Sequence, residues 1–232
     1  MSGGFDRPGR REPIFNLPPV IIALIVLCVG IHLVSIYVLS EDQYIWLLVH
    51  ASFVPIFYGG QVPLDFVPFA GPVAYSFLHG GFAHLIINMV WLAAFGSPLA
   101  NRIGVMRFLL FWGVSALAAA GLHYAIYPTS NAPLIGASGA ISAMMGAAAR
   151  FGFRIDRAEG RPAFAGPVLS IPVVLRMRST MTFLAIWMII NIVTGLSGFV
   201  PGVDSQIAWE AHIGGFVVGF FFMSAFDRPK RY

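Results

Sequence analysis

Long apolar segments dominate this sequence and restrict it to one class of fold. Six segments have this character, and they are residues 20–39, 81–100, 104–126, 138–152, 180–197 and 206–226. Charged residues make up only 10% of the chain, whereas a soluble domain carries about 25%. The hydrocarbon core of a bilayer is about 30 Å thick, so a helix needs about 20 apolar residues to cross it. Since the backbone in lipid must satisfy its own hydrogen bonds, the segments predict an all-α, polytopic membrane protein with six helices.

The basic residues lie on one side of this predicted bundle. All 14 Lys and Arg residues lie near the two ends of the chain or at alternate connections between the apolar segments. The remaining connections contain none, and they are residues 40–80, 127–137 and 198–205. The positive-inside rule therefore predicts that both termini are cytoplasmic and that residues 40–80 are external.

This topology divides the chain into parts. We expect a cytoplasmic N-terminal segment of residues 1–19, one membrane domain of residues 20–226 and a cytoplasmic tail of residues 227–232. No small-residue cleavage pattern follows the first apolar segment, so we expect it to be an uncleaved anchor. Residues 40–80 are rich in aromatics and proline, which favours a position in the membrane interface. We assign no regular structure to residues 153–179, where prolines lie among arginines.

Residues that bind metals or form disulfides are scarce. Cys28 is the only cysteine, which excludes an intramolecular disulfide and a thiolate cluster. His79 and His84 are five residues apart, a poor spacing for two ligands on one helix, and no His-Glu-x-x-His motif is present. No pair of aspartates lies in an apolar segment, as an intramembrane aspartyl protease would require. We expect no metal, no cofactor and, because the basic residues follow the membrane topology, no nucleic acid partner.

Ser138 begins an apolar segment that is too short to cross the membrane. It lies in Gly136-Ala-Ser-Gly, and the apolar run after it ends at Arg150. At about 1.5 Å per residue this run covers about 18 Å, so Ser138 is expected well below the far membrane surface. A hydroxyl at that depth, beside the free N–H groups of a helix N-terminus, should face protein or a water-filled cavity. We interpret Ser138 as a nucleophile.

Two more polar residues are expected at a similar depth. Measured from the nearest cytoplasmic arginine, Asn88 lies about 21 Å and His212 about 24 Å into the membrane. His84 lies one turn before Asn88 on the same helix face. Each residue alone would more often be a hydrogen-bonded packing residue, but three at one level favour a site. Gly215 belongs to a Gly-x-x-x-Gly face that would let His212 approach Ser138 closely.

These residues have what acyl transfer requires. A serine hydroxyl is a weak nucleophile, and the neutral imidazole of His212 can act as its general base. The Asn88 amide, the His84 N–H and the backbone N–H of Ser138 are candidate donors to an oxyanion. Glu210 is two residues from His212 and so on another helix face, which predicts a Ser–His dyad without a third member.

The chain resembles the rhomboid family of intramembrane serine proteases, of the bacterial six-helix type, over nearly its whole length. The matching stretches are Phe77-Leu-His-Gly-Gly-Phe-Ala-His-Leu-Ile-Ile-Asn-Met, Gly136-Ala-Ser-Gly and Ala211-His-Ile-Gly-Gly-Phe-Val-Val-Gly. The resemblance implies that Ser138 is the nucleophile, His212 the base, and His84 and Asn88 oxyanion contributors. It also implies a six-helix core in the bacterial inner membrane. Transmembrane protein substrates are expected to enter near the second and fifth helices, under a mobile loop at residues 198–205.

The sequence departs from the family pattern at two places. Many rhomboids have a tyrosine four residues after the nucleophile, whose ring is thought to pack on the catalytic histidine, but here the residue is Ser142. The Trp-Arg pair common in the first external loop of bacterial members is also absent, because residues 40–80 contain no arginine. The support of His212 and the docking of this loop are thus left open.

Two other function classes remain alternatives. A non-catalytic rhomboid-like protein could bind and retain transmembrane clients, although loss of Ser138 or His212 would be its expected signature. A small-solute transporter could use polar residues in a broken helix, but no inverted repeat or buried charge supports it.

Overall fold

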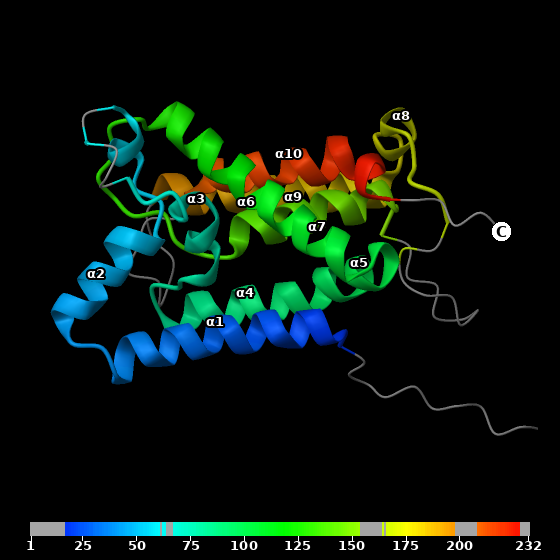
Figure 1. The fold of residues 1–232 in the computed structure, drawn as a ribbon. Coiled ribbons are helices and arrows are strands. Elements are labelled where there is room, and N and C mark those ends of the chain that lie inside the picture. Colours follow the sequence, from blue (N-terminus) through cyan, green and yellow to red (C-terminus); the bar gives the residue numbers. More distant parts are fainter. Residues whose placement is uncertain are drawn as a thin grey trace, which may run out of the picture.

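The computed structural model describes residues 17–60, 62–63, 67–153, 164, 166–197 and 208–227, with only the backbone at residues 196 and 197. In these ranges the regular structure is helical apart from one isolated bridge between Phe53 and Leu134. The α-helices are α1 (Pro19–Tyr37), α2 (Glu41–Ala51), α3 (Gly71–Ala74), α4 (Phe82–Trp91), α5 (Ser97–Ile103), α6 (Val105–Ile126), α7 (Ser138–Arg150), α8 (Ile171–Val174), α9 (Arg178–Ser197) and α10 (Trp209–Phe226). Figure 1 shows the longer helices running side by side, with α2 at the end opposite α8.

Five helical stretches are long and apolar enough to cross a membrane. They are Pro19–Tyr37, Phe82–Ile103, Val105–Ile126, Arg178–Gly195 and Trp209–Phe226. The second stretch joins α4 to α5 through a π-helical turn at Leu92–Gly96. The remaining predicted segment forms α7, which has 13 residues and is too short to cross. The all-α, polytopic fold predicted from the apolar segments is confirmed.

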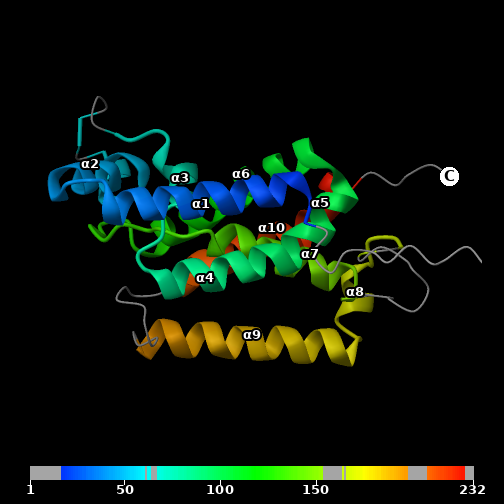
Figure 2. The ribbon, with the colours of Figure 1, turned by 90° about the horizontal axis from the view of Figure 1, so that it is seen from below.

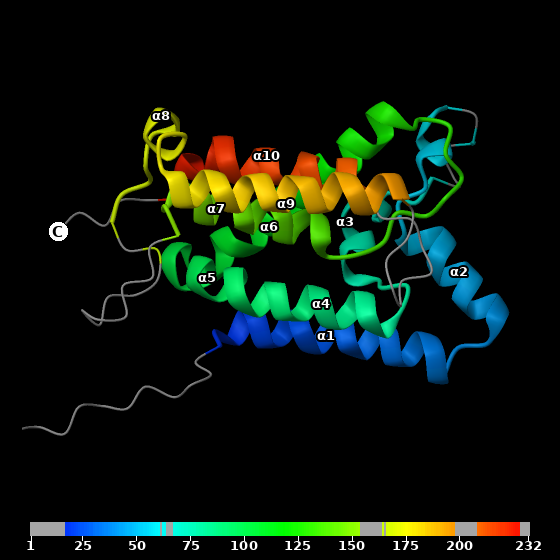
Figure 3. The same ribbon diagram turned by 180° about the vertical axis from the view of Figure 1, so that it is seen from behind.

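Helix α7 lies at the centre of the bundle, packed against α6 and α10 (Figures 1 and 3). Every residue of α7 after Ser138 is buried, and most are glycine, alanine, serine or methionine. Small residues let helix backbones approach closely, which is the main packing mode where lipid removes the hydrophobic driving force. A Cβ added at Gly146 would lie 2.7 Å from the carbonyl oxygen of Phe216 on α10. The sequence of α7 therefore fixes a close contact with α10.

The segment between α1 and α4 is more regular than its composition suggests. Ser40 and Gln43 form a capping box that starts α2, and 3₁₀ turns occur at Pro55–Tyr58 and Tyr75–Phe77. The segment docks on the bundle through the Phe53–Leu134 bridge and through the Tyr75 hydroxyl, which donates to the Ala116 carbonyl at 3.0 Å. These contacts show how the loop is held without the Trp-Arg pair.

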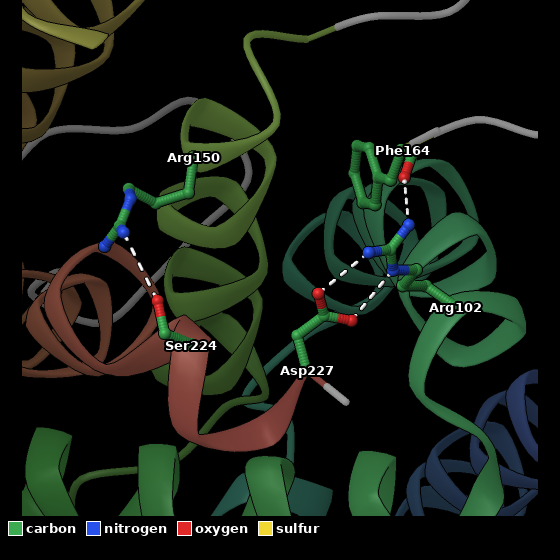
Figure 4. Close-up of polar contacts among 5 residues, drawn as sticks. All are labelled: Arg102, Arg150, Phe164, Ser224 and Asp227. Carbon is green, nitrogen blue, oxygen red and sulfur yellow. Dashed lines mark hydrogen bonds and ion pairs between the residues drawn. The ribbon is translucent and has the colours of Figure 1, made fainter. Parts of the chain in front are cut away.

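Two arginines form hydrogen bonds between helices at the end of the bundle where α5 and α7 end, which we call the arginine end (Figure 4). Arg102 makes a two-pronged ion pair with Asp227, with both N–O distances at 2.8 Å, and also donates to the Phe164 carbonyl. Arg150 donates to the carbonyl of Leu169 at 2.8 Å and reaches Ser224 at 3.4 Å. These bonds tie the ends of α5, α7 and α10 together, so the helices that carry the site cannot easily slide along one another.

One local prediction is wrong. Residues 153–179 were expected to lack regular structure, but Ile171–Val174 forms α8 and α9 begins at Arg178. Pro172 lies at the start of α8, where its missing N–H costs no intrahelical hydrogen bond. Residues 154–163 and 165 lie outside the described residues, as do the predicted loop at 198–205, residues 1–16 and the end of the tail.

Candidate active site

Ser138 and His212 are hydrogen-bonded to each other. Ser138 is the first residue of α7, and His212 lies in the first turn of α10. The distance from His212 Nε2 to Ser138 Oγ is 2.8 Å. This is the approach that the small-residue faces of the two helices predict.

Glycines on α10 make the approach possible. A Cβ at Gly215 would overlap the carbonyl oxygen of Gly139, and one at Gly219 would overlap that of Ala143. Gly215 therefore faces α7, as the sequence predicts. Because it lies one turn after His212, the contact holds the imidazole directly beside the start of α7.

His84 lies near Gly136 at the approach to Ser138, in the first turn of α4. A Cβ at Gly136 would lie 2.8 Å from both Cε1 and Nε2 of His84, and 3.6 Å from Ser138 Oγ. Gly136 has a φ of 124°, a left-handed conformation that side chains rarely adopt. The glycine thus lets the chain turn into α7 while leaving space for the His84 ring near the Ser138 hydroxyl.

Asn88 is buried one turn further along α4. Its Nδ2 donates to the His84 carbonyl at 3.0 Å, which uses one of the two amide N–H groups. Asn88 and His84 both line the cavity that contains Ser138. The four residues predicted to form the site are therefore brought to one place, from α4, α7 and α10.

The His79 ring packs against the ring of His84. The rings of His79 and His84 are 5.2 Å apart, and the His79 carbonyl accepts a hydrogen bond from Nδ1 of His32 on α1 at 3.0 Å. Burial, with a smaller contribution from His84, lowers the pKa of His79 to about 3. His79 is thus uncharged at neutral pH and contributes packing beside His84.

The cavity around Ser138 has a volume of about 630 Å³. Its polar lining includes His84, Asn88, Ser138, Asn191 and His212, and its apolar lining includes Trp91, Met145, Phe183, Ile186 and Trp187. These side chains come from α4, α7, α9 and α10. Ser138 thus shares one pocket with other polar groups and with apolar side chains of α4 and α9.

Asn191 is the site residue that sequence reasoning missed. It is buried on α9, and its Oδ1 lies 2.5 Å from Nδ1 of His212. Because Glu210 is on another helix face, the sequence predicts a Ser–His dyad without a third member, but the Asn191 amide contacts His212 on its second ring nitrogen. A signal was present, because Asn191 lies about 20 Å along α9 from Arg178, the same level as Asn88 and Ser138.

Glu210 pairs with another histidine. Its Oε1 accepts from Nδ1 of His123 on α6 at 2.5 Å, and both side chains are buried. The expectation that Glu210 does not face His212 agrees with this pairing. Among the described residues, no group of three or more His, Cys, Asp or Glu side chains is arranged to hold a metal ion.

Comparisons with known proteins point to one family. A family model described as the Rhomboid domain matches residues 70–228. RHOMBOID-like protein 5 of Arabidopsis thaliana is 30% identical over 145 residues, which is 62% of this chain and 40% of that protein. RHOMBOID-like protein 4 of the same plant is 30% identical over 145 residues, covering 62% of this chain and 31% of the relative. Rhomboid protease GlpG of Yersinia pestis (strain Pestoides F) is 28% identical over 147 residues, 63% of this chain and 44% of that protein. The matches thus span less than half the length of these relatives.

Proposed function

Since the chain belongs to the rhomboid family, we propose that it is a serine endopeptidase that cuts transmembrane segments of other proteins within the membrane. Its apolar helices and its family make it an integral membrane protein. The observation that carries the proposal is the 2.8 Å hydrogen bond between Ser138 and His212, inside a cavity of the apolar bundle. A nucleophile and a base at this distance are the minimum needed for acyl transfer.

In the proposed reaction His212 Nε2 removes the proton of Ser138 as Oγ attacks the carbonyl carbon of the scissile peptide. The protonated imidazole then gives this proton to the leaving amine, which releases one half of the substrate. Water repeats the sequence on the acyl-serine and releases the other half. Because every proton passes through Nε2, the ring must keep this atom toward Ser138 throughout.

The developing oxyanion needs donors, and we assign three to it. They are the second N–H of the Asn88 amide, the His84 ring and the backbone N–H of Ser138. The placement of the His84 ring against Gly136 and the free N–H groups at the start of α7 support this assignment. In a low-dielectric cavity such donors stabilise charge more than they would in water.

Substrates would enter the cavity from the lipid between α4 and α9, since Ile87, Trp91 and Ile186 line it there. The one-sided distribution of Lys and Arg supports a cytoplasmic position for the arginine end and both termini. We assign the protein to a bacterial inner membrane on its resemblance to bacterial rhomboids. The cut would therefore fall near the external face. The partners are transmembrane proteins and the bilayer.

Cleavage of a reporter transmembrane substrate by the protein in liposomes tests the proposal. The wild-type protein should release both fragments, and Ser138→Ala should release neither. Ser115→Ala is the matched control, because Ser115 is a fully buried serine on α6 outside the cavity. Binding of the substrate without cleavage by the wild-type protein would instead favour a non-catalytic, client-binding rhomboid-like protein.

A further inference from the structure

We propose that Asn191 is a positioning residue that fixes the tautomer and orientation of the His212 ring. The inference rests on the proposed function, since it concerns how His212 serves as a base. Asn191 Oδ1 lies 2.5 Å from His212 Nδ1, and His212 Nε2 lies 2.8 Å from Ser138 Oγ. The three side chains form one line of hydrogen bonds from α9 through α10 to α7.

The amide of Asn191 can face His212 with only one of its ends. Its Nδ2 donates to the Trp187 carbonyl at 2.7 Å, one turn back on α9. A flipped amide would turn an acceptor oxygen toward that carbonyl oxygen, leaving both without a donor. Oδ1 therefore faces His212, and as a pure acceptor it requires a proton on Nδ1. In the neutral imidazole this leaves Nε2 as the acceptor for the Ser138 hydroxyl, which is the tautomer a general base needs.

Glu210 lies two residues before His212 in the sequence, but its carboxylate is paired with His123. In the observed arrangement it therefore cannot accept a hydrogen bond from His212 Nδ1. Ser142 stands where many rhomboids have a tyrosine ring against the histidine, so that support is absent here. The Asn191 amide thus supplies the contact that holds the His212 ring from the side away from Ser138.

The position of Asn191 also couples the site to the packing of α9. Among the described side chains of α9, only Thr180 and Asn191 are buried, and Figure 2 shows the helix at the edge of the bundle. Its contacts with α10 recur every four residues. They are the stacked rings of Trp187 and Phe216 with centroids 4.9 Å apart, the Asn191–His212 hydrogen bond, and the close approach of Gly195 to Trp209. The tautomer of His212 is therefore set only while α9 is docked on α10.

The test compares Asn191→Leu with Asn191→Asp in the same detergent. Leucine is branched at Cγ as asparagine is but cannot accept a hydrogen bond, whereas aspartate keeps an oxygen opposite Nδ1. Asn191→Leu should lower kcat about tenfold, equivalent to about 1.4 kcal/mol of activation free energy, with KM little changed. Asn191→Asp should recover part of this loss. Thr180→Val is the control, because it removes the other buried polar group on α9 about 16 Å away and should leave kcat unchanged.

A second measurement needs no variant at position 191. In wild-type protein labelled with [¹⁵N]histidine, the ring-nitrogen shifts show which nitrogen carries the proton, and His212→Ala assigns the signal. The proposal requires the Nδ1–H tautomer for neutral His212. A dominant Nε2–H tautomer, or full kcat in Asn191→Leu, would overturn it while leaving the proposed function intact. Full cleavage by Ser138→Ala would instead overturn the proposed function itself.

Discussion

Replacing Gly215 by alanine tests whether the close contact of α10 with α7 places His212. The added methyl group would overlap the carbonyl oxygen of Gly139, which belongs to the helix backbone and cannot move aside as a flexible side chain could. The two helices must then separate by about 1 Å. The 2.8 Å contact between His212 and Ser138 would stretch past the hydrogen-bond limit of about 3.5 Å.

This separation gives the expected magnitudes. A misplacement of about 1 Å can cost about 10²-fold in rate, so kcat should fall by that order. Overpacking typically costs about 1–3 kcal/mol, and replacing glycine by alanine within a helix offsets about 1 kcal/mol of this. The free energy of unfolding should therefore fall by no more than about 2 kcal/mol, and activity should suffer more than stability.

The assay is cleavage of the reporter substrate by purified protein, with the melting temperature measured in the same detergent. Gly113→Ala is the matched control, because Gly113 lies in α6 and a Cβ there would have nothing within 4 Å. It should keep full activity and melt at the same or a higher temperature. If Gly215→Ala behaved like Gly113→Ala, the close contact would not be what positions His212.

Three further predictions concern the site and the membrane topology. Asn88→Ala should lower kcat by up to about 10²–10³-fold and leave KM similar, since an oxyanion donor acts mainly in the transition state. An unchanged kcat with a lower melting temperature would make Asn88 a packing residue. Gly136→Ala should abolish cleavage, because its φ of 124° and the His84 ring both exclude a side chain; cleavage at the wild-type rate would place His84 elsewhere. In a Cys28→Ser background, a cysteine at position 230 should react with a membrane-impermeant thiol reagent only from the cytoplasm, and reaction only from outside would reverse the topology.

The sequence predicted most of what depends on one-dimensional spacing. The short run from Ser138 to Arg150 requires a helix that starts inside the bundle, and α7 is that helix. Gly215, one turn after His212, predicts the face that meets α7, and the structure has it there. These features follow because helix rise and periodicity convert position along the chain into depth and direction.

Contacts between distant segments could not be derived in this way. An asparagine in an apolar helix can bond any neighbour, so the partner of Asn191 depends on the rotation of α9 against α10. Arg150 ends the apolar run that starts at Ser138, but it is buried and its guanidinium donates to carbonyls of other segments, which the sequence does not indicate. The capping box of Ser40 and Gln43, which starts α2, is a signal that the sequence reasoning missed.

The attachment site of a fluorophosphonate tests most directly the claim that Ser138 is a nucleophile activated by His212. The reagent forms a stable bond with an activated serine oxygen, and peptide mass spectrometry of the treated protein identifies the residue. We expect one adduct, on the peptide that contains Ser138, formed far more slowly in His212→Ala and at the wild-type rate in Ser115→Ala. No adduct on Ser138 in protein that still cleaves its substrate, or equal labelling rates with and without His212, would contradict the account.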